Sequence, residues 1–580
     1  MPFFLVFVFP GNFLDRTPLR AYNTFMIISV APYSFLHRLG LRAIFVFLVS
    51  IAMLSASLSH AKTPQQIESA QQAEKQLQTD TEPFLTILQK AQKRAGRSFK
   101  SEEARVPDFL WSLTEAQWKG IQFNPAHSLW RKKPLLFDLE LFHPGFIYNN
   151  SIIINVIDKD SQTVLPFSPE MFTYSNNALA GKVAQTLPGF SGFRITYPLN
   201  NPHSREGILS FLGASYFNST GKYARKGVHA RGLALNTALS TGEEIPFFRE
   251  FWIVTPKPSD ISLTVYAMLD APSLTGVYRY IITPGTSTVM DVDARLFLRK
   301  DAIWPQKIGI APLTSMFLYS ETDNGKPGDY RPEVHNSDGL LLFREDNAWS
   351  WVPLVNPSRL AVNTFQMENP RGFGLMQRDA DFDHYQDIAN RFDCKSSVWV
   401  EPQGDWGTGR IELIQIPSTD EIHDNITTFW VPDSLAPNTE TTPPQSISLA
   451  YKLYWLTAGV TPHTLGRATS TRVIKNADTA RFFIDFESEA LKKLPEEFGL
   501  TSLVETPENA PITDKQLMKN PATGGWRLIF TVKLPRQDSV MQSIISAREG
   551  SARLRFRALL KRGENLPDPL TEEWIYDLPL

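Results

Sequence analysis

The stretch SLAYKLYWL, residues 448–456, alternates between two kinds of position. Large apolar side chains fall at every second residue: Leu449, Tyr451, Leu453 and Trp455. Lys452 lies between two of them, on the opposite face of an extended chain. A period of two is typical of a β-strand with one buried face.

Runs of the same kind recur from about residue 106 to the C-terminus. The 580-residue chain contains 42 prolines and 32 glycines, which break it into short apolar segments. Examples are SIIINVI (151–157), ISLTVYAML (261–269), SSVWVEP (396–402), GRIELIQI (409–416) and GWRLIF (525–530). Many short strands between turn residues predict an all-β fold made of β-sandwiches. We expect a large N-terminal sandwich over residues 101–462, and a second sandwich over residues 468–580 with the length of an immunoglobulin-like domain.

The first 61 residues have the order of a secretory signal peptide. Arg38 and Arg42 precede the apolar run AIFVFLVSIAMLSA (43–56), and Ser59 and Ala61 supply the small side chains of a cleavage site. We therefore predict a signal peptide over residues 1–61, with Met26 as the true start of the protein, and a periplasmic location.

Residues 62–100 form a polar extension that we expect to be helical. The segment EPFLTILQKAQKR (82–94) places Phe84, Ile87, Leu88 and Ala91 at helical spacing. This spacing predicts a short amphipathic helix.

Composition excludes several classes of function. The net charge is -2, which removes the electrostatic basis for a nucleic-acid partner. Cys394 is the single cysteine, so no intramolecular disulfide can form. The sequence contains no nucleotide-binding loop and no zinc-type spacing of Cys and His, so we predict neither a cofactor nor a metal ion.

Carboxylates and aromatic residues concentrate between residues 330 and 430. Aromatic faces stack on sugar rings, while charged and amide side chains bind hydroxyl groups, so this composition favours a carbohydrate site. The densest cluster is STDEIHDN (418–425), with three carboxylates and one imidazole in a single turn. We expect the substrate to contact the following residues: Trp349, Trp351, Arg371, Tyr385, Trp399, Glu401, Trp406, Glu421 and Trp430.

Long blocks of the chain resemble one known family. They include LGASYF (212–217), ARGLALNTA (230–238), TGEEIPFFREFW (241–252), YRPEVHNSDGL (330–340), MENPRGFGLMQRDADFDHYQD (367–387) and WVEPQGDWGTGRIELIQIPSTDEIHDNITTFWVPD (399–433). These blocks resemble the MdoG/OpgG and OpgD family of periplasmic glucan biosynthesis proteins, from about residue 82 to the end. The resemblance implies a galactose-mutarotase-like sandwich with a cleft, followed by an immunoglobulin-like domain.

The resemblance also implies an activity and a general acid. Members look like inverting β-1,2-glucanases, and the position that matches their general acid is Asp424. A general acid must stay protonated near neutral pH. We expect the neighbouring Asp420 and Glu421, together with burial against Phe429 and Trp430, to raise the pKa of Asp424.

The position of the general base departs from the family pattern. Hydrolytic relatives have HDSDG where this chain has HNSDG, which places Asn336 at the position of the base. An amide cannot accept a proton from water as a carboxylate does. Asp338 and Glu333 are the nearby carboxylates that could substitute. Relatives also commonly carry Tyr where this chain has Phe392, which removes a hydroxyl group from a possible proton relay.

Two hypotheses follow. The protein is an inverting β-1,2-glucanase that trims the glucan backbone, with Asp424 as the acid. Alternatively, it is a non-catalytic partner that binds the glucan oligosaccharide delivered by an inner-membrane glucan glucosyltransferase. Asn336 favours weak or absent hydrolysis. A transglycosylating enzyme is a third possibility, favoured if water activation is poor while sugar binding stays intact.

Overall fold

The computed structural model describes residues 82–100, 106–159, 161–322, 328–437, 446–535, 553–563 and 568–579. The predicted signal peptide and residues 62–81 lie outside these ranges. Residues Thr81–Leu580 form one compact unit. Within the described ranges, no helix combines the length and the apolar character that a membrane crossing requires.

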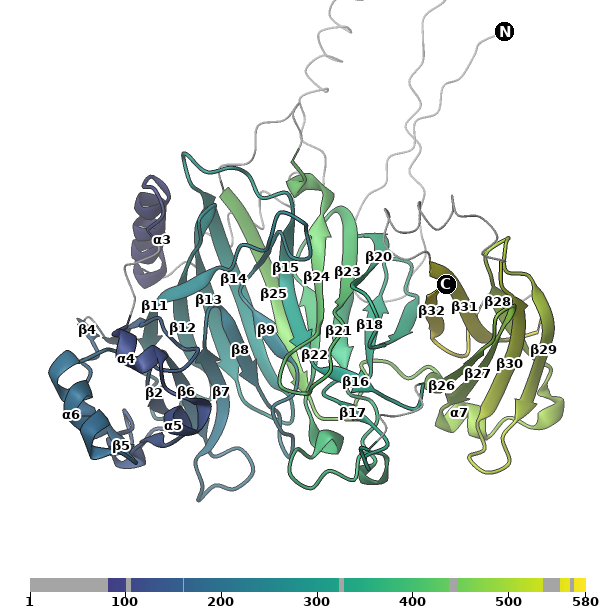
Figure 1. Ribbon diagram of the computed structural model, residues 1–580, viewed down its shortest axis with the longest axis horizontal. Coiled ribbons are helices and arrows are strands. Elements are labelled where there is room, and N and C mark those ends of the chain that lie inside the picture. Colours follow the sequence, from purple (N-terminus) through teal and green to yellow (C-terminus); the bar gives the residue numbers. More distant parts are fainter. Residues whose placement is uncertain are drawn as a thin grey trace, which may run out of the picture. The chain divides into compact units, whose positions relative to one another are not determined.

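The fold is all-β, as predicted, and its largest part consists of two long sheets (Figure 1). The ten-stranded sheet contains, in spatial order, β2 (Asp138–Phe142), β6 (Gly192–Tyr197), β7 (Glu206–Leu212), β8 (Tyr216–Ser219), β9 (His229–Arg231), β15 (Ile308–Ser315), β24 (Ile426–Pro432), β23 (Thr408–Gln415) and β20 (Ala361–Glu368), with β10 (Ala234–Leu235) paired to β15.

The fourteen-stranded sheet is built from strands that are distant in sequence. Its spatial order is β28 (Leu500–Glu505), β31 (Arg553–Arg562), β32 (Glu573–Pro579), β19 (Trp349–Pro353), β18 (Gly339–Phe343), β21 (Gly372–Met376), β22 (Ser397–Pro402), β25 (Ser446–Leu456), β14 (Thr288–Leu298), β13 (Leu274–Thr283), β12 (Leu263–Asp270), β11 (Phe247–Val254), β3 (Ile153–Asp158) and β4 (Ser161–Val164).

Three smaller sheets and a few short helices complete the described chain. The sheets are β26 (Arg467–Lys475), β27 (Thr479–Glu487), β30 (Trp526–Lys533) and β29 (Ile512–Lys519); β1 (Ile121–Phe123) with β5 (Phe172–Tyr174); and β16 (Phe317–Tyr319) with β17 (Val334–His335). The α-helices are α3 (Glu82–Ala95), α4 (Asp108–Trp111), α5 (Glu115–Lys119), α6 (Asn177–Thr186) and α7 (Glu489–Lys492).

The main core lies between the two long sheets. The alternation that opened the sequence analysis is confirmed, because the four apolar residues of β25 are buried and those between them are only partly buried. Rings from both sheets meet here: Phe211 of β7 stacks on Phe193 at 5.2 Å and contacts Phe251 and Tyr280 edge-on or tilted. Such aromatic pairs add to the free energy gained from burial.

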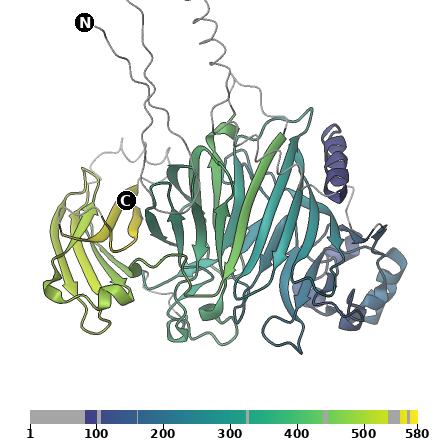
Figure 2. The same ribbon diagram turned by 180° about the vertical axis from the view of Figure 1, so that it is seen from behind.

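A second core lies where the C-terminal sandwich is predicted. The sheet β26-β27-β30-β29 faces β28, β31 and β32, and Figure 2 shows these yellow-green strands from the opposite side. Phe482 of β27 lies 4.9 Å from Phe556 and 5.7 Å from Trp574, measured between ring centroids. These three rings are fully buried.

The two sandwiches share a sheet. The last strand, β32, runs parallel to β19 and pairs Ser350 with Glu573 and Trp351 with Trp574. Strands from both sides of the predicted boundary near residues 460–470 therefore belong to one continuous fourteen-stranded sheet.

The predicted amphipathic helix is confirmed as α3, with Phe84, Ile87 and Ala91 buried. It lies against the face of the fourteen-stranded sheet that is turned away from the main core, and Phe84 stacks on Tyr266 at 5.8 Å. Lys90 also pairs with Glu250 at 2.6 Å. The described part of the extension, residues 82–100, thus belongs to the folded unit.

We predict that Phe482→Ala destabilises the protein by about 3–5 kcal/mol, because it leaves a cavity among the buried rings of the second core. Phe483→Ala is the matched control. Phe483 is the next residue of the same strand, is only partly buried, and should cost about 1 kcal/mol or less. Urea unfolding monitored by circular dichroism measures both values, and equal losses would contradict the prediction.

Candidate functional site

The acidic turn, residues 416–425, connects the neighbouring antiparallel strands β23 and β24. Asn425 fixes the end of this turn. Its side-chain amide donates to the carbonyl oxygens of Phe317 (2.9 Å) and Ile416 (3.0 Å), and its Oδ1 accepts from the Phe317 N–H (2.8 Å). Three hydrogen bonds from one buried side chain hold the residue that follows Asp424 in a single orientation.

Asp424 bonds to two strands of the ten-stranded sheet. Its Oδ2 accepts from Thr314 Oγ1 of β15 at 2.8 Å and lies 3.0 Å from His229 Nδ1 of β9. Thr314 pairs in register with both His229 and Thr427, so strands β9, β15 and β24 present these groups side by side. The Asp424 side chain keeps 25% of its surface exposed.

The expectation that the pKa of Asp424 is raised is wrong. Burial alone would raise it, but the charge and the hydrogen bond of His229 and the hydroxyl of Thr314 outweigh burial and hold the pKa below its usual value. Asp420 and Glu421 do not supply the expected repulsion, because each is bonded elsewhere. Asp424 is therefore ionised at neutral pH.

Asp420 is bonded within the turn itself. Its Oδ1 accepts from the Ile422 N–H (3.0 Å) and lies 3.1 Å from His423 Nδ1. The hydrogen bond from Ile422 and the one from His423 lower the pKa of Asp420. This carboxylate stabilises the turn and has no direct bond to Asp424.

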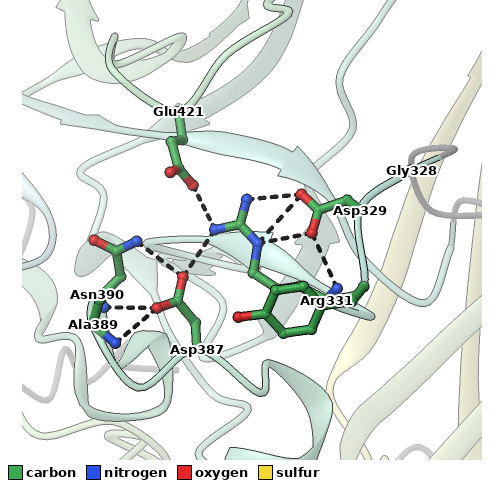
Figure 3. A pocket seen from close by; sticks show the side chains of 8 residues that line it. Gly328, Asp329, Arg331, Asp387, Ala389, Asn390 and Glu421 are labelled. Carbon is green, nitrogen blue, oxygen red and sulfur yellow. Dashed lines mark hydrogen bonds and ion pairs between the residues drawn. The ribbon is translucent and has the colours of Figure 1, made fainter.

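Glu421 points the other way, toward Arg331. Figure 3 shows the Arg331 guanidinium between three carboxylates. Its Nη1 donates to Asp387 and to Glu421, both at 2.8 Å, and its Nη2 donates to Asp329 at 2.8 Å. The hydrogen bonds of Arg331 hold the pKa of Asp329 well below its usual range. One guanidinium thus joins three separate loops.

An open pocket of about 640 Å³ surrounds this arginine. We call it the Arg331 pocket; it is lined by Gly328, Asp329, Tyr330, Arg331, Asp387, Ala389, Asn390 and Glu421. Asp387 organises one wall, because it accepts from the N–H groups of Ala389 (3.0 Å) and Asn390 (2.8 Å) and from the Asn390 side-chain amide (2.9 Å). The wall is therefore held in place before any ligand binds.

Asn336, at the family's base position, lies at the end of the short strand β17. Its N–H donates to the Met316 carbonyl at 2.8 Å. Its Oδ1 is buried and has no hydrogen-bond partner in the part of the chain that the structure describes. Asp338 accepts from the N–H groups of Arg378 (2.9 Å) and Asp379 (3.0 Å) through Oδ2, and burial raises its pKa.

The two possible substitute bases open into a second cavity, of roughly 200 Å³. Glu333 and Asp338 line it, together with residues of β26 such as Arg467. Glu421 of the acidic turn lines the Arg331 pocket instead. The turn that carries Asp424 and the carboxylates nearest to Asn336 in sequence therefore face different cavities.

The second cavity contains one group of side chains that could hold a cation. Ligand atoms of Glu333, Asp379 and His384 lie within 4.8 Å of one another. Each already has a partner: His384 Nδ1 lies 2.5 Å from Asp379 Oδ2, and Glu333 lies 2.9 Å from His335 Nε2. Burial lowers the pKa of His335, but Glu333 more than offsets this and raises it to about 9. These ion pairs explain why the three side chains lie close together.

Most of the aromatic candidates are core residues. Trp430 and Tyr385 are fully buried, and Trp351 and Trp399 nearly so. Rings that are covered on both faces by neighbouring side chains leave a sugar no surface to stack on. In these buried positions, the rings of the four residues cannot stack on a sugar.

Trp349 is only partly buried, but its ring is also occupied by neighbours. It stacks on Phe343 with the ring centroids 4.1 Å apart. The same ring lies 5.4 Å from Trp399, against the second core. These contacts leave little of the Trp349 ring for a ligand.

The remaining candidates do not converge on the acidic turn either. Trp406 donates through Nε1 to the Ala450 carbonyl at 3.3 Å, Glu401 accepts from the Tyr454 hydroxyl at 3.1 Å, and the Arg371 guanidinium lies over Phe343. Among the predicted substrate contacts, Glu421 is the one that lines the Arg331 pocket.

Several residues of this site were not predicted, among them His229, Thr314 and Arg331. His229 and Thr314 lie 195 and 110 residues before Asp424 in sequence. His229 stands in a basic segment (224–231), and Thr314 in an apolar one, so neither marks an acidic site. Arg331 did lie within the quoted block YRPEVHNSDGL, beside the position of the base. The strand order brings His229 and Thr314 beside Asp424, and the bond to Glu421 joins Arg331 to the acidic turn.

We predict that His229→Ala raises the pKa of Asp424, because the variant loses the charge and the hydrogen bond that lower it. The lowered pKa in the wild type means that Asp424 stabilises the folded protein above its unfolded pKa of about 3.9, and that this contribution is lost as the pH falls through the folded value. Carbon-13 NMR titration of the side-chain carboxyl groups, assigned with Asp424→Asn, measures the change.

His423→Ala is the control for this titration, since His423 contributes least of the groups that lower the pKa of Asp424. It should produce the smaller shift. An unchanged Asp424 titration in His229→Ala would show that the pairing does not set the pKa.

A second titration concerns Glu321, which lines the second cavity. Burial and the nearby Glu333 raise its pKa to about 7. A carboxyl group with a raised folded pKa loses its contribution to stability as the pH rises through that value. We predict that Glu321→Gln gains up to about 3 kcal/mol relative to wild type between pH 5 and pH 8. Urea unfolding at both pH values measures this, with the exposed Glu345→Gln as the control, and a parallel loss in both proteins would contradict it.

The comparison with known proteins agrees with the sequence resemblance. A family model described as "Periplasmic glucan biosynthesis protein, MdoG" matches residues 83–578, which is nearly all of the described chain. This confirms the expected family, and with it the periplasmic location and the involvement in glucan biosynthesis. The chain belongs to the MdoG family of periplasmic glucan biosynthesis proteins.

Proposed function

We propose that this protein binds the β-1,2-linked backbone of a periplasmic glucan beside the acidic turn and guides its assembly without cutting it. The observation that carries the proposal is the state of Asp424. Its Oδ2 is held by His229 and Thr314, and its pKa is lowered. An ionised carboxylate cannot protonate the leaving oxygen of a glycosidic bond.

The second catalytic group is also missing from its family position. Inverting hydrolysis needs a carboxylate base that activates water on the opposite side of the sugar from the acid. Asn336 is an amide, and Glu333 and Asp338 line the second cavity rather than the Arg331 pocket. Binding places no such demand on the site, because fixed acceptors such as Asp424 and Glu421 can accept hydrogen bonds from sugar hydroxyl groups while ionised.

This role suits a partner that receives a growing chain. The inner-membrane glucan glucosyltransferase is the source of that chain in our proposal, and the protein acts on the chain after it reaches the periplasm. Asp424 and its partners then serve to orient the backbone.

An inverting β-1,2-glucanase is the second candidate, and one observation favours it. In the Asp424 side chain, 25% of the surface is exposed to solvent. Burial is the largest influence on the pKa of this side chain. A bound sugar that covers this surface would raise the pKa toward that of a general acid.

Incubation of the purified mature protein with linear β-1,2-glucan separates the two candidates. We expect isothermal titration calorimetry to detect binding, while an assay for reducing ends detects no release by the wild type. Asn336→Asp alone should release no reducing ends either, because it returns a carboxylate to the base position but leaves Asp424 ionised. Asp420→Asn is the control, since Asp420 lies in the same turn but bonds to His423.

Each other result has a clear meaning. Release of reducing ends by the wild type, abolished by Asp424→Asn, would overturn the binding role and establish a glucanase whose base is not residue 336. An absence of both binding and release would overturn both candidates.

A further inference from the structure

The floor of the Arg331 pocket is polar, rigid and close to neutral. Arg331 faces three carboxylates, and two further cations lie nearby. Arg225 donates to the carbonyl of the lining residue Ala389 at 3.0 Å. Lys395 is close enough to Asp387 and Glu421 to feel their charges. Three positive and three negative groups balance, so the pocket favours neither a phosphate nor a metal ion.

Hydrogen-bonding capacity remains on this floor. Glu421 bonds to Arg331 through Oε2 and keeps more than a third of its side chain exposed. Asn390 donates through Nδ2 to Asp387, and its Oδ1 accepts no hydrogen bond from any other described residue. In Figure 3 the Asn390 amide nitrogen is turned toward Asp387 and its oxygen away from it. Both free oxygens can accept hydrogen bonds from the hydroxyl groups of a neutral ligand.

Large apolar side chains are exposed at the pocket and next to its polar network in sequence. Tyr330, Ile388 and Ile422 have 76%, 80% and 78% of their surface exposed. Each is next in sequence to a residue of the Arg331 network, namely Arg331, Asp387 and Glu421. Of the three, Tyr330 lines the pocket itself and places a large exposed aromatic ring beside the polar floor.

A pyranose ring has the complementary chemistry. Its C–H faces are apolar and stack on aromatic or aliphatic side chains, while its edge carries hydroxyl groups that need acceptors and donors. We propose that the Arg331 pocket is a subsite for one glucose unit of the glucan, with Tyr330 stacked on the ring and with Glu421 and Asn390 bonded to its hydroxyl groups. This inference rests on the proposed function.

The position of the pocket extends the binding surface. Ile422 and Glu421 belong to the same turn as Asp424, two and three residues before it. In this proposal, a glucan chain bound at Asp424 continues along the acidic turn to the Arg331 pocket. The subsite should contribute to the binding of longer oligosaccharides and not to that of a disaccharide held at Asp424 alone.

Calorimetry with linear β-1,2-gluco-oligosaccharides of increasing length tests the subsite. Tyr330→Ala should weaken binding of the longer oligosaccharides roughly 2- to 12-fold, which is the range expected for the loss of one stacked ring. Tyr330→Phe keeps the ring and should bind as the wild type does. Ile261→Ala removes another exposed apolar side chain, in the loop before β12, and should also bind normally.

Ile422→Ala is an independent second variant and should weaken the same oligosaccharides. Tyr330 and Ile422 are exposed, so neither change should alter the unfolding midpoint, which is measured alongside. Unchanged affinity in both variants, with a wild type that binds, overturns the subsite and leaves the proposed function standing. A wild type that binds no oligosaccharide of any length overturns the proposed function together with the subsite.

Discussion

The carboxylate of Glu572 is fully buried at the junction of the two sandwiches, and the arrangement of the whole unit depends on how it is neutralised. Arg378 donates to both of its oxygens at 2.8 and 2.9 Å, His463 Nε2 lies 3.0 Å away, and the Ala468 N–H donates to it at 2.9 Å. The Arg378 guanidinium also lies 3.3 Å from the centre of the Trp351 ring. A buried charge without partners is strongly unfavourable, so this network requires the end of β21 and the starts of β32 and β26 to lie together.

The same junction reaches the candidate site. The N–H of Arg378 donates to Asp338. Asp338 lies two residues after Asn336, and Asn336 is the residue at the family's base position. Asp338 therefore takes part in the junction of the sandwiches, whereas Asp424 and Glu421 lie on a turn fixed by β9, β15 and Arg331. This separation supports the proposal that the protein binds glucan without cutting it.

The fold was predictable from the sequence because its signals are local. Alternation in β25 and helical spacing in α3 each depend on a few adjacent residues, and both were confirmed. The candidate site was less predictable, because its electrostatics depend on pairs that are distant in sequence. The sequence around Asp424 is dominated by like charges, and the residues that do most to lower its pKa arrive from β9 and β15. Trp430 was misleading for the same reason, since an aromatic residue beside an acidic turn gives no indication that its ring lies in the main core.

The parallel pairing of β19 with β32 also has a consequence for the order of folding. β19 ends at Pro353, but its partner begins at Glu573, so the chain must be almost complete before this edge is paired. During synthesis and export, which proceed from the N-terminus, the first sandwich carries an open strand edge, and open edges are templates for association with other chains. Strand β32 covers the open edge of β19, so any truncation that removes β32 would expose the larger sandwich to aggregation.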